Sequence, residues 1–510
     1  MSWARSVDEL ERRRAFALEM GGPERLARQK EQGKLNARER VAGLIDEDSF
    51  EELGSLAGVG SYIEGQLERV MPSAGVIGLA RLNGRTVAVD ADDFTARGIG
   101  GHQKAAFIER MAEEYRIPLV MLLDGFGAAV SGGEVKAPNP PGWGARSMSL
   151  LGEVPVVTAI MGSSAGWPAA RAMLAHFVVI VKGTGQMFAA GPPVVRRAIG
   201  REISKEELGG SEVHARFSGC AHNEAESEEE AFRLIRRFLS FLPQNVWELP
   251  PDVEPTDDPN RRAEELLSIV PESRMRAYDM RQLVRHVVDN GDLFEIQPQY
   301  GLSVITGLAR LNGHTVGILA SNPMHLGGAI DGPAADKQTH FIEMCDSFHI
   351  PLVYFVDVPG LMVGPQAERE GTLRRGMRAA WTLFNATVPE IQVIVRKCYG
   401  MAGAATNNSA RMTLQLAWPS AEWGNIPIQG GVDAQFRREI ENAPDPAARR
   451  RELEEQLLAN SSPFRSAEQF GIHDIIDPRV TRETIIKFLE AAIPARAHNL
   501  GPKQRIGVRP

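Results

Sequence analysis

Gly78-Leu-Ala-Arg-Leu-Asn-Gly84 occurs twice in this chain, the second time as Gly307-Leu-Ala-Arg-Leu-Asn-Gly313. In both copies an Asn-Gly pair, typical of a tight β-hairpin turn, separates two apolar runs. The second copy begins 229 residues after the first, which is too far for a solenoid, whose repeats span about 20–50 residues. The repeat therefore predicts a duplicated domain.

Further matches follow each heptapeptide in the same order. Ile117-Pro-Leu-Val120 recurs as Ile350-Pro-Leu-Val353. Chance similarity between two α/β segments is the alternative, and collinear matches make it a poor explanation. The residues that recur next are Asp124 as Asp357, Gly127 as Gly360, and Val154-Pro155 as Val388-Pro389.

Four segments are predicted to be strands at equivalent places in the two copies. Arg85–Asp90 and Thr315–Ala320 alternate in hydrophobicity directly after the Asn-Gly turns. Leu119–Leu123 and Leu352–Val356 are continuous apolar runs, which suit strands buried on both faces. Helical patterns between them indicate βαβ connections, so the sequence predicts an α/β fold with largely parallel sheets.

The flanking segments differ from the repeats. Ser6-x-x-Glu9 and Asn36-x-x-Glu39 are capping-box patterns that predict charged, amphipathic helices near the N-terminus. Glu248–Arg261 is rich in Pro and Asp and is predicted to be a linker, and Ala434–Leu457 is predicted to be a highly charged helical segment. We therefore expect one domain at residues 1–250, a linker at 251–270 and a second domain at 271–510.

Composition excludes several classes of protein. The 510 residues carry a net charge of −8, with 43% hydrophobic and 24% charged residues, as in a globular protein, and no long basic tract suggests nucleic-acid binding. Cys220, Cys345 and Cys398 lie too far apart for a disulfide framework or a zinc ribbon. Charges by residue 5 argue against a signal peptide, and the apolar run Val154–Ala170 contains Ser, Gly and Pro, which indicates a buried strand and turn rather than a membrane span. We expect a cytoplasmic protein without a membrane segment.

Common catalytic motifs are missing from the sequence. It contains no Walker A motif, no GxGxxG after a strand, no HExxH and no GxSxG elbow. The Gly-rich stretch from Phe126 to Gly133 lacks the Lys-Ser/Thr ending of a phosphate loop. His214 and His222 fit no metal-ligand spacing and are expected to be structural, so no metal is predicted. Cys398 has no CxxC partner, which argues against a dithiol redox site.

Small-residue turns after buried strands are the positive signal. Each copy has two of them, around Gly127 and Gly166 in the first and around Gly360 and Gly400 in the second. Small residues at a strand-to-helix turn let backbone N–H groups face a ligand oxygen, and two converging N–H groups form an oxyanion hole. Tight packing of a helix on a strand demands the same residues, and the spacing leaves both interpretations open.

Collinear motifs extend this pattern over nearly the whole chain. They resemble the carboxyltransferase β subunit of biotin-dependent acyl-CoA carboxylases, of the propionyl-CoA carboxylase type. The motifs include Gly33-Lys-Leu-Asn-Ala-Arg-Glu-Arg40, Glu206-Glu-Leu-Gly-Gly210, Phe355-Val-Asp-Val-Pro-Gly360, Arg396-Lys-Cys-Tyr-Gly400 and Ala417-Trp-Pro-Ser-Ala-Glu422.

The resemblance implies two tandem crotonase-like (ClpP/crotonase) domains and an enzyme that moves a carboxyl group from carboxybiotin to the α-carbon of an acyl-CoA. Such a reaction needs two oxyanions stabilised, the thioester enolate and the ureido oxygen of biotin. Biotin itself can take the α-proton of the acyl-CoA, so no side-chain base is needed. This agrees with the absence of a common catalytic motif from the sequence. By resemblance the two holes would meet across a dimer interface, with Gly127 and Gly360 in neighbouring turns. The predicted donors are Gly166 and Trp167 toward the thioester, and Met401 and Ala402 toward biotin.

Partners and cofactor follow from the same resemblance. The sequence has no Met-Lys-Met biotinylation motif and no ATP-binding segment. Biotin carboxylase and a biotin carrier protein or subunit are therefore expected as partners, with biotin as the carrier-borne cofactor and a coenzyme A thioester as the substrate. The resemblance also implies a homo-oligomer, namely a hexamer.

Three turns depart from the family pattern. The family's Asp-Ser-Gly-Gly-Ala-Arg is Asp124-Gly-Phe-Gly-Ala-Ala129 here, its Cys-Ala-Gly-Gly is Ser164-Ala-Gly-Trp167, and its Tyr-Gly-Gly-Ala-Tyr-Asp is Tyr399-Gly-Met-Ala-Gly-Ala404. Phe126 and Ala404 are therefore predicted to contact substrate, and an acyl group other than a plain short one is expected. Two alternatives stay open: a biotin-dependent decarboxylase or transcarboxylase of a carboxyacyl-CoA, and a non-catalytic scaffold subunit.

Overall fold

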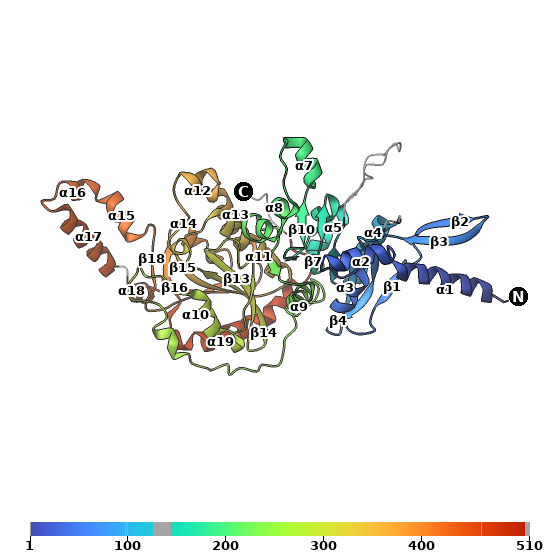
Figure 1. Ribbon diagram of the computed structural model, residues 1–510. Helices are drawn as coiled ribbons and strands as arrows, with labels where there is room; N and C mark the ends of the chain where they lie inside the picture. Colours follow the sequence, from blue (N-terminus) through green and yellow to red (C-terminus); the bar gives the residue numbers. More distant parts are fainter. Residues whose placement is uncertain (1, 97, 99, 126–143, 461, 505–510) are drawn as a thin grey trace. The chain divides into compact units, whose positions relative to one another are not determined.

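A computed structural model describes residues 2–96, 98, 100–125, 144–460 and 462–504 (Figure 1). The chain divides into two compact units, Met1–Glu248 and Leu249–Pro510. Each unit is built on one large sheet. In the described parts of the chain, no helix combines the length and the apolar character needed to cross a membrane.

The sheet of the first unit has seven strands in the order β1-β4-β5-β6-β7-β9-β11. The β1–β4 and β4–β5 pairs are antiparallel and all later pairs are parallel. The strands are β1 (Glu51–Leu53), β4 (Gly75–Leu82), β5 (Arg85–Asp92), β6 (Leu119–Leu123), β7 (Val156–Ile160), β9 (Phe177–Val181) and β11 (Asn223–Ala225).

The sheet of the second unit follows the same path. Its order is β12-β13-β14-β15-β16-β17-β19, with β18 beside β16, and again the first two pairs are antiparallel and the rest parallel. The strands are β12 (Phe294–Ile296), β13 (Val304–Leu311), β14 (His314–Ser321), β15 (Leu352–Val358), β16 (Glu390–Tyr399), β17 (Thr413–Ala417), β18 (Glu422–Gly424) and β19 (Asp474–Ile475). The four predicted strands are present, and three of them extend beyond their predicted ends.

The repeated heptapeptide forms β4 in one sheet and β13 in the other, each ending in a tight turn. Asn83-Gly84 and Asn312-Gly313 both have two positive φ angles, 51° and 79° in the first and 49° and 79° in the second, which is the type I′ geometry that Asn-Gly favours. One aspartate carboxylate receives both turn N–H groups in each unit. Asp46 accepts them at 2.9 and 2.7 Å, and Asp289 accepts them at 3.0 and 2.9 Å.

Helices cover the sheets because their apolar faces pack onto the strands. Ile108 and Ala112 of α4 lie in the core of the first unit, and Leu283 and Val284 of α10 in that of the second. The helices of the first unit are α1 (Ala4–Glu19), α2 (Pro23–Glu31), α3 (Ala37–Leu44), α4 (Gly101–Tyr115), α5 (Ala145–Ser149), α6 (Trp167–Ala172), α7 (Pro192–Ile199), α8 (Lys205–Gly209) and α9 (Glu228–Leu239). Those of the second are α10 (Met280–Val287), α11 (Gly332–Ser347), α12 (Pro365–Arg369), α13 (Thr372–Asn385), α14 (Gly400–Ala404), α15 (Ile428–Gln435), α16 (Arg437–Glu441), α17 (Pro446–Asn460), α18 (Pro463–Glu468) and α19 (Thr481–Ala492).

The two capping predictions had different outcomes. Asn36 forms the complete capping box at the start of α3, accepting from the Glu39 N–H while the Glu39 side chain accepts from the Asn36 N–H. The Ser6 prediction is wrong, because α1 already begins at Ala4 and Ser6 lies inside the helix.

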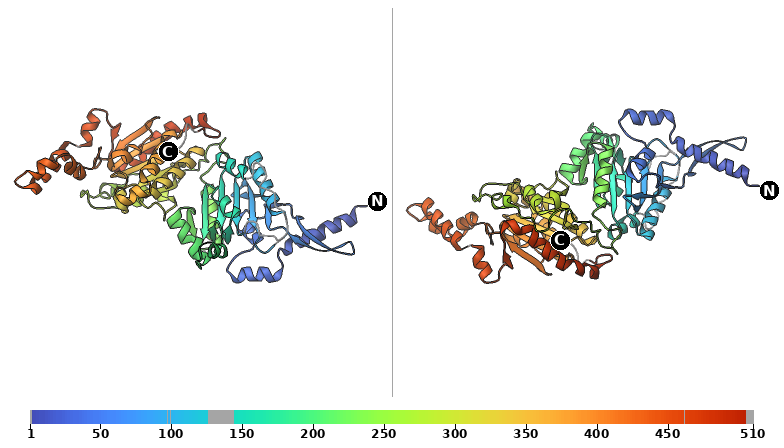
Figure 2. Two further views of the ribbon diagram at one scale, coloured as in Figure 1. Left: turned by 90° about the horizontal axis from the view of Figure 1, so that it is seen from above. Right: turned by 90° about the horizontal axis from the view of Figure 1, so that it is seen from below.

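The charged C-terminal segment is helical but is not one helix. It consists of α15, α16 and α17, with breaks at Phe436 and at residues 442–445. Pro444 lies in the second break, and Pro446 is the first residue of α17. Figure 2 shows these helices extending away from the sheet of the second unit. The stretch predicted to be a linker, 251–270, belongs to the second unit, since Ala263 and Leu266 are buried in its core.

Candidate active site

The repeated aspartate of the first unit, Asp124, is buried at the end of β6. Lys34 Nζ lies 2.9 Å and Arg40 NH1 3.0 Å from its Oδ2. Arg40 also donates to both carboxylate oxygens of Glu228, at 2.9 and 2.7 Å. Burying charges is costly unless they are paired and hydrogen-bonded. This network therefore ties Lys34 and the helix α3 to Asp124 at the end of β6.

The second turn of this unit joins β8 (Ser163–Ala165) to α6 at Gly166. Gly166 has φ 69° and ψ −125°, a conformation that a side chain disfavours. Its N–H donates to the Phe188 carbonyl oxygen at 3.2 Å, and Phe188 belongs to β10 (Gln186–Phe188), which pairs in parallel with β8. Of the two predicted donors, the Gly166 N–H is thus already hydrogen-bonded within the fold, whereas Trp167 is the first residue of α6.

A buried arginine anchors the helix behind this turn. Arg171 of α6 donates from NH2 to Asp90 at 2.8 Å and from Nε to Glu109 at 2.9 Å. Asp90 lies on β5 and Glu109 on α4. The position of the turn is therefore set by a charge network that joins three elements.

The second unit repeats the arrangement with different partners. Asp357, fully buried near the end of β15, accepts from Arg396 Nε at 3.0 Å and NH2 at 2.9 Å. The backbone N–H of Lys397 donates to its other oxygen at 3.1 Å. The Arg396 guanidinium also lies over the Tyr278 ring, 4.9 Å from its centroid. Here the cation comes from the neighbouring strand β16 instead of an N-terminal helix.

The predicted biotin-side turn follows β16. Gly400 has φ 60° and opens α14, the short helix that contains the two predicted donors. Met401 is 53% exposed, Ala402 is buried, and Ala404 is exposed at the end of the helix. The first N–H groups of a helix have no acceptor within the helix. Met401 and Ala402, the two predicted donors, lie in this first turn of α14.

The remaining predicted residues are only partly placed. Gly360 follows β15 with φ 144°, and a Cβ there would meet no atom within 4 Å, so the turn borders open space. Phe126 and Gly127 lie outside the described residues. The meeting of the two holes across a dimer interface stays a prediction.

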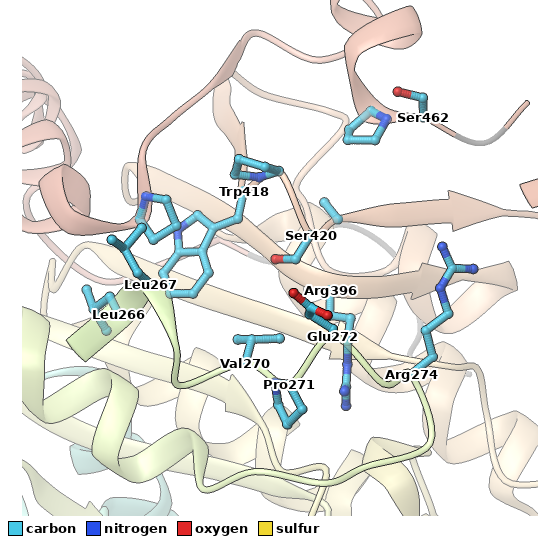
Figure 3. Close-up of a pocket in the computed structure, with 14 residues that line it drawn as sticks. Leu266, Leu267, Val270, Pro271, Glu272, Arg274, Arg396, Trp418, Ser420 and Ser462 are labelled. Atoms are coloured by element: carbon cyan, nitrogen blue, oxygen red, sulfur yellow. The ribbon is translucent and has the colours of Figure 1, made fainter. Parts of the chain in front are cut away.

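A cavity of about 460 Å³ lies in the second unit, beside the Asp357–Arg396 pair (Figure 3). The side chains of Leu266 and Leu267 gather next to the Trp418 indole, and Arg274 lines the opposite side. Arg274 is paired with Glu422 at 2.7 Å. Across the described ranges no three His, Cys, Asp or Glu side chains gather as metal ligands would.

Comparisons with known proteins identify the class. The family described as carboxyl transferase domain matches residues 28–506. The propionyl-CoA carboxylase carboxyltransferase subunit of Haloferax mediterranei is 38% identical over 492 residues, covering 94% of each chain. Methylmalonyl-CoA decarboxylase subunit alpha of Veillonella parvula is 36% identical and covers 95% of each chain. A solved structure of the transcarboxylase 12S hexamer with methylmalonyl-coenzyme A bound has a TM-score of 0.90 and 33% identity, covering 100% of this chain and 99% of that one.

The fold is thus that of a crotonase-like carboxyltransferase, which confirms the predicted fold class. The chain belongs to the carboxyl transferase domain family.

Sequence reasoning did not predict the buried ion pairs of Lys34, Arg40 and Arg171. Lys34 and Arg40 lie in the Gly33–Arg40 motif, but their pairing with Asp124 joins positions 84 or more residues apart. Arg171 belongs to none of the motifs that were recognised in the sequence. An arginine inside an apolar, small-residue stretch was the available signal, because such a residue needs a buried partner.

Proposed function

We propose that this chain is the carboxyltransferase subunit of a biotin-dependent acyl-CoA carboxylase. It would transfer a carboxyl group from carboxybiotin to the α-carbon of an acyl-CoA. The observation that carries the proposal is the end-to-end likeness, in both sequence and fold, to subunits that are named for this chemistry. The family match over residues 28–506 supports the same assignment.

The acyl-CoA side is assigned to the first unit. The Gly166 turn is held from two directions, by the Phe188 carbonyl and by Arg171 within α6. With the Gly166 N–H engaged in this way, the Trp167 N–H is the donor assigned to the enolate oxygen, and a preorganised backbone suits this role because it needs no reorganisation during the reaction. Trp167, whose ring packs where a Cβ on Gly144 would lie, provides an aromatic wall beside this turn.

The biotin side is assigned to the second unit, where the residues present fit the group. The α14 turn presents the exposed Met401 and small neighbours, and the Gly360 turn borders open space. Met401 and Ala402 would hold the ureido oxygen through their backbone N–H groups. Carboxybiotin, when bound, supplies the carboxyl group, and the chain's own contribution is to position it through these backbone donors.

A biotin-dependent decarboxylase is the second candidate. The 36% identity to a methylmalonyl-CoA decarboxylase subunit over 95% of the chain favours it specifically. The same two turns would serve both directions, since each direction passes through the same oxyanions. A scaffold subunit is the third candidate, and the altered turns motivate it.

The assembly follows from the same comparison. We infer that the chain forms a hexamer, as the transcarboxylase 12S protein does. It would act with a biotin carboxylase and a biotin carrier, in the cytoplasm. All three cysteines are free thiols, which agrees with a reducing compartment.

The test uses the full-length chain with a biotin carrier protein that a biotin carboxylase has charged with labelled bicarbonate and ATP. We expect label to leave the carrier only when an acyl-CoA is present and to appear in a carboxyacyl-CoA. Release of CO2 from methylmalonyl-CoA through uncharged carrier, without the forward transfer, would support the decarboxylase instead. If no acyl-CoA in a panel from acetyl-CoA to long-chain esters moves label in either direction, the enzyme proposal fails.

A further inference from the structure

The glycine before one short helix packs against the tryptophan that begins another. α5 begins directly after Gly144, and α6 begins with Trp167. Gly144 has a positive φ of 73°, and a Cβ on it would lie 2.8 Å from the Trp167 ring. A side chain at this position would therefore have to push the ring aside. Trp167 is half-buried, so part of its surface stays accessible.

One buried carboxylate binds both of these helices. Glu109 of α4 accepts from Ser147 Oγ of α5 at 2.9 Å, and its other oxygen accepts from Arg171 Nε of α6, also at 2.9 Å. Arg171 extends the network to Asp90 of β5 at 2.8 Å. All four side chains belong to residues that are more than nine-tenths buried. Because a buried polar group that loses its partner is costly, these bonds fix α5 and α6 on the same point of α4.

The two helices are too short to hold their positions unaided. α5 has five residues and α6 has six, and isolated helices of this length are unstable in water. Arg171 lies four residues after Trp167, so the two side chains leave α6 on the same side. The bonds to Glu109 therefore determine where the Trp167 ring lies relative to Gly144.

A second attachment of α5 provides an internal contrast. Ser149 Oγ donates to Glu113 of α4 at 3.1 Å in an exposed position, and Arg146 forms an ion pair with the same carboxylate. Glu113 thus joins α5 to α4, whereas Glu109 joins α5 to both α4 and α6. Loss of the Ser147 hydroxyl would leave α5 attached through its outer side, so the protein should stay folded.

One residue supplies both the donor and the aromatic wall that are assigned to the acyl-CoA side. The Trp167 N–H is the donor assigned to the enolate oxygen, and the indole is attached to the same Cα. An acyl group whose thioester oxygen binds this N–H therefore has the ring beside it. The position of the ring depends on its packing against Gly144 and on the bonds to Glu109.

We propose that Ser147, Glu109 and Arg171 are positioning residues that set the acyl specificity of the first unit through Trp167. The class of substrate they select is an acyl-CoA with a flat apolar acyl group. Such a group covers the ring and gains an aromatic contact, whereas acetyl and propionyl groups are too small to cover it. The inference rests on the proposed function, which assigns the acyl-CoA to this turn.

Binding is measured by titrating the full-length protein with phenylacetyl-CoA and with propionyl-CoA. The biotin carrier is left out, so no carboxyl group is transferred. We expect the natural chain to bind phenylacetyl-CoA more tightly by about two- to tenfold, the range of one aromatic contact. Ser147→Ala should remove most of this preference by raising the Kd of phenylacetyl-CoA, while the Kd of propionyl-CoA stays nearly the same.

Ser149→Ala is the matched control, because it removes a hydroxyl from the same helix that bonds Glu113 instead of Glu109. It should keep the preference of the natural chain. An unchanged preference in Ser147→Ala would overturn the proposal. An equal loss in both variants would overturn it as well, since any weakening of α5 would then be enough.

Gly144→Ala tests the position of the ring while the bonds to Glu109 stay intact. The added Cβ has to displace the Trp167 ring, so this variant should also lose the preference for phenylacetyl-CoA. A preference that survives in folded Gly144→Ala protein would show that the place of the ring against Gly144 does not set specificity, and would overturn the proposal.

Turnover with a charged biotin carrier is measured separately from binding. Ser147→Ala should raise KM for phenylacetyl-CoA and change kcat little, because the Trp167 N–H remains. A network that only stabilises the fold would lower the unfolding midpoint without moving the ratio of the two KM values, and that outcome contradicts the proposal. If neither ester is carboxylated by the natural chain, the proposed function fails, whereas the binding preference is still decided by the titration.

Discussion

Arg396 holds the fully buried Asp357 carboxylate with two nitrogens, Nε at 3.0 Å and NH2 at 2.9 Å. The equivalent aspartate of the first unit, Asp124, is held instead by Lys34 and Arg40, from segments far away in the sequence. The same carboxylate position is thus neutralised in two different ways. In both units, a buried aspartate paired with a cation lies directly behind a candidate turn.

Replacing Arg396 by Met should destabilise the second unit by about 3–5 kcal/mol, because the buried Asp357 would lose its cation. Urea unfolding followed by circular dichroism measures the change. Arg437→Met is the matched control, since Arg437 pairs with Glu441 on an exposed helix surface and should leave the midpoint where it was. Equal midpoints for the two variants would show that the Asp357 pair does not support the fold.

Replacing Gly166 by Ala should abolish most carboxyltransfer while the protein stays folded. Ala disfavours φ 69° with ψ −125°, at a cost of about 1–3 kcal/mol, and a displaced turn loses an oxyanion donor, which typically costs about 10²–10³ in rate. Gly183→Ala is the control, because Gly183 also has a positive φ, of 77°, but lies in another turn with open space around it. Comparable kcat values for the two variants would remove the Gly166 turn from the site.

Glu390 should make the stability of the second unit depend on pH. Burial raises its pKa to about 7, while Thr413 and the Asn408 N–H donate to one oxygen at 3.0 and 2.8 Å. Because the pKa is higher in the folded state, the unfolded chain ionises first as pH rises. The free energy of unfolding should therefore fall between about pH 4.5 and 7 and level off above, by roughly 3 kcal/mol in total from this group.

Glu390→Gln, which cannot ionise, should flatten this dependence, and urea unfolding at a series of pH values measures it. Glu441→Gln removes one charge from an exposed position and is the control. If the slope between pH 5 and 7 is the same in both variants and the natural protein, Glu390 is not the group responsible.

Local features of this fold could be predicted and long-range ones could not. Leu119–Leu123 is a strand at the predicted residues, and the Asn83-Gly84 turn follows from the backbone conformations that these two residues allow. The first helix was misplaced, because nothing local distinguishes Trp3 from Ser6 as the residue before it. The charge pairs behind the turns, such as Arg40 with Glu228, join residues 188 positions apart.

The positions of the two candidate turns, around Gly166 and at Gly400–Ala404, could be predicted because small residues follow a strand in each. Their role as oxyanion holes stays a prediction. The engagement of the Gly166 N–H depends on Phe188 in β10, a strand whose pairing with β8 no local pattern specifies. For this reason the sequence indicated where the turns lie but not that the Gly166 N–H is hydrogen-bonded within the fold.

Replacing Ala404 by Asp should shift acyl preference toward short chains. Ala404 is exposed at the end of α14, at a position where the family resemblance implies an acid and this chain carries a methyl group. If the two turns meet across a dimer interface as predicted, a carboxylate at residue 404 would lie beside the acyl group of the partner's site and would have to lose water against a long apolar chain, a cost that a short acyl group avoids. We expect the ratio of kcat/KM for propionyl-CoA over a long-chain acyl-CoA to rise by about tenfold, equivalent to roughly 1.4 kcal/mol.

Ala404→Ser is the control, because it places a small uncharged side chain at the same position. It should change the ratio of kcat/KM much less than Ala404→Asp does. A ratio that is the same in both variants and in the natural chain would mean that residue 404 does not face the acyl group, and that the unusual preference expected for this enzyme has to come from the first unit.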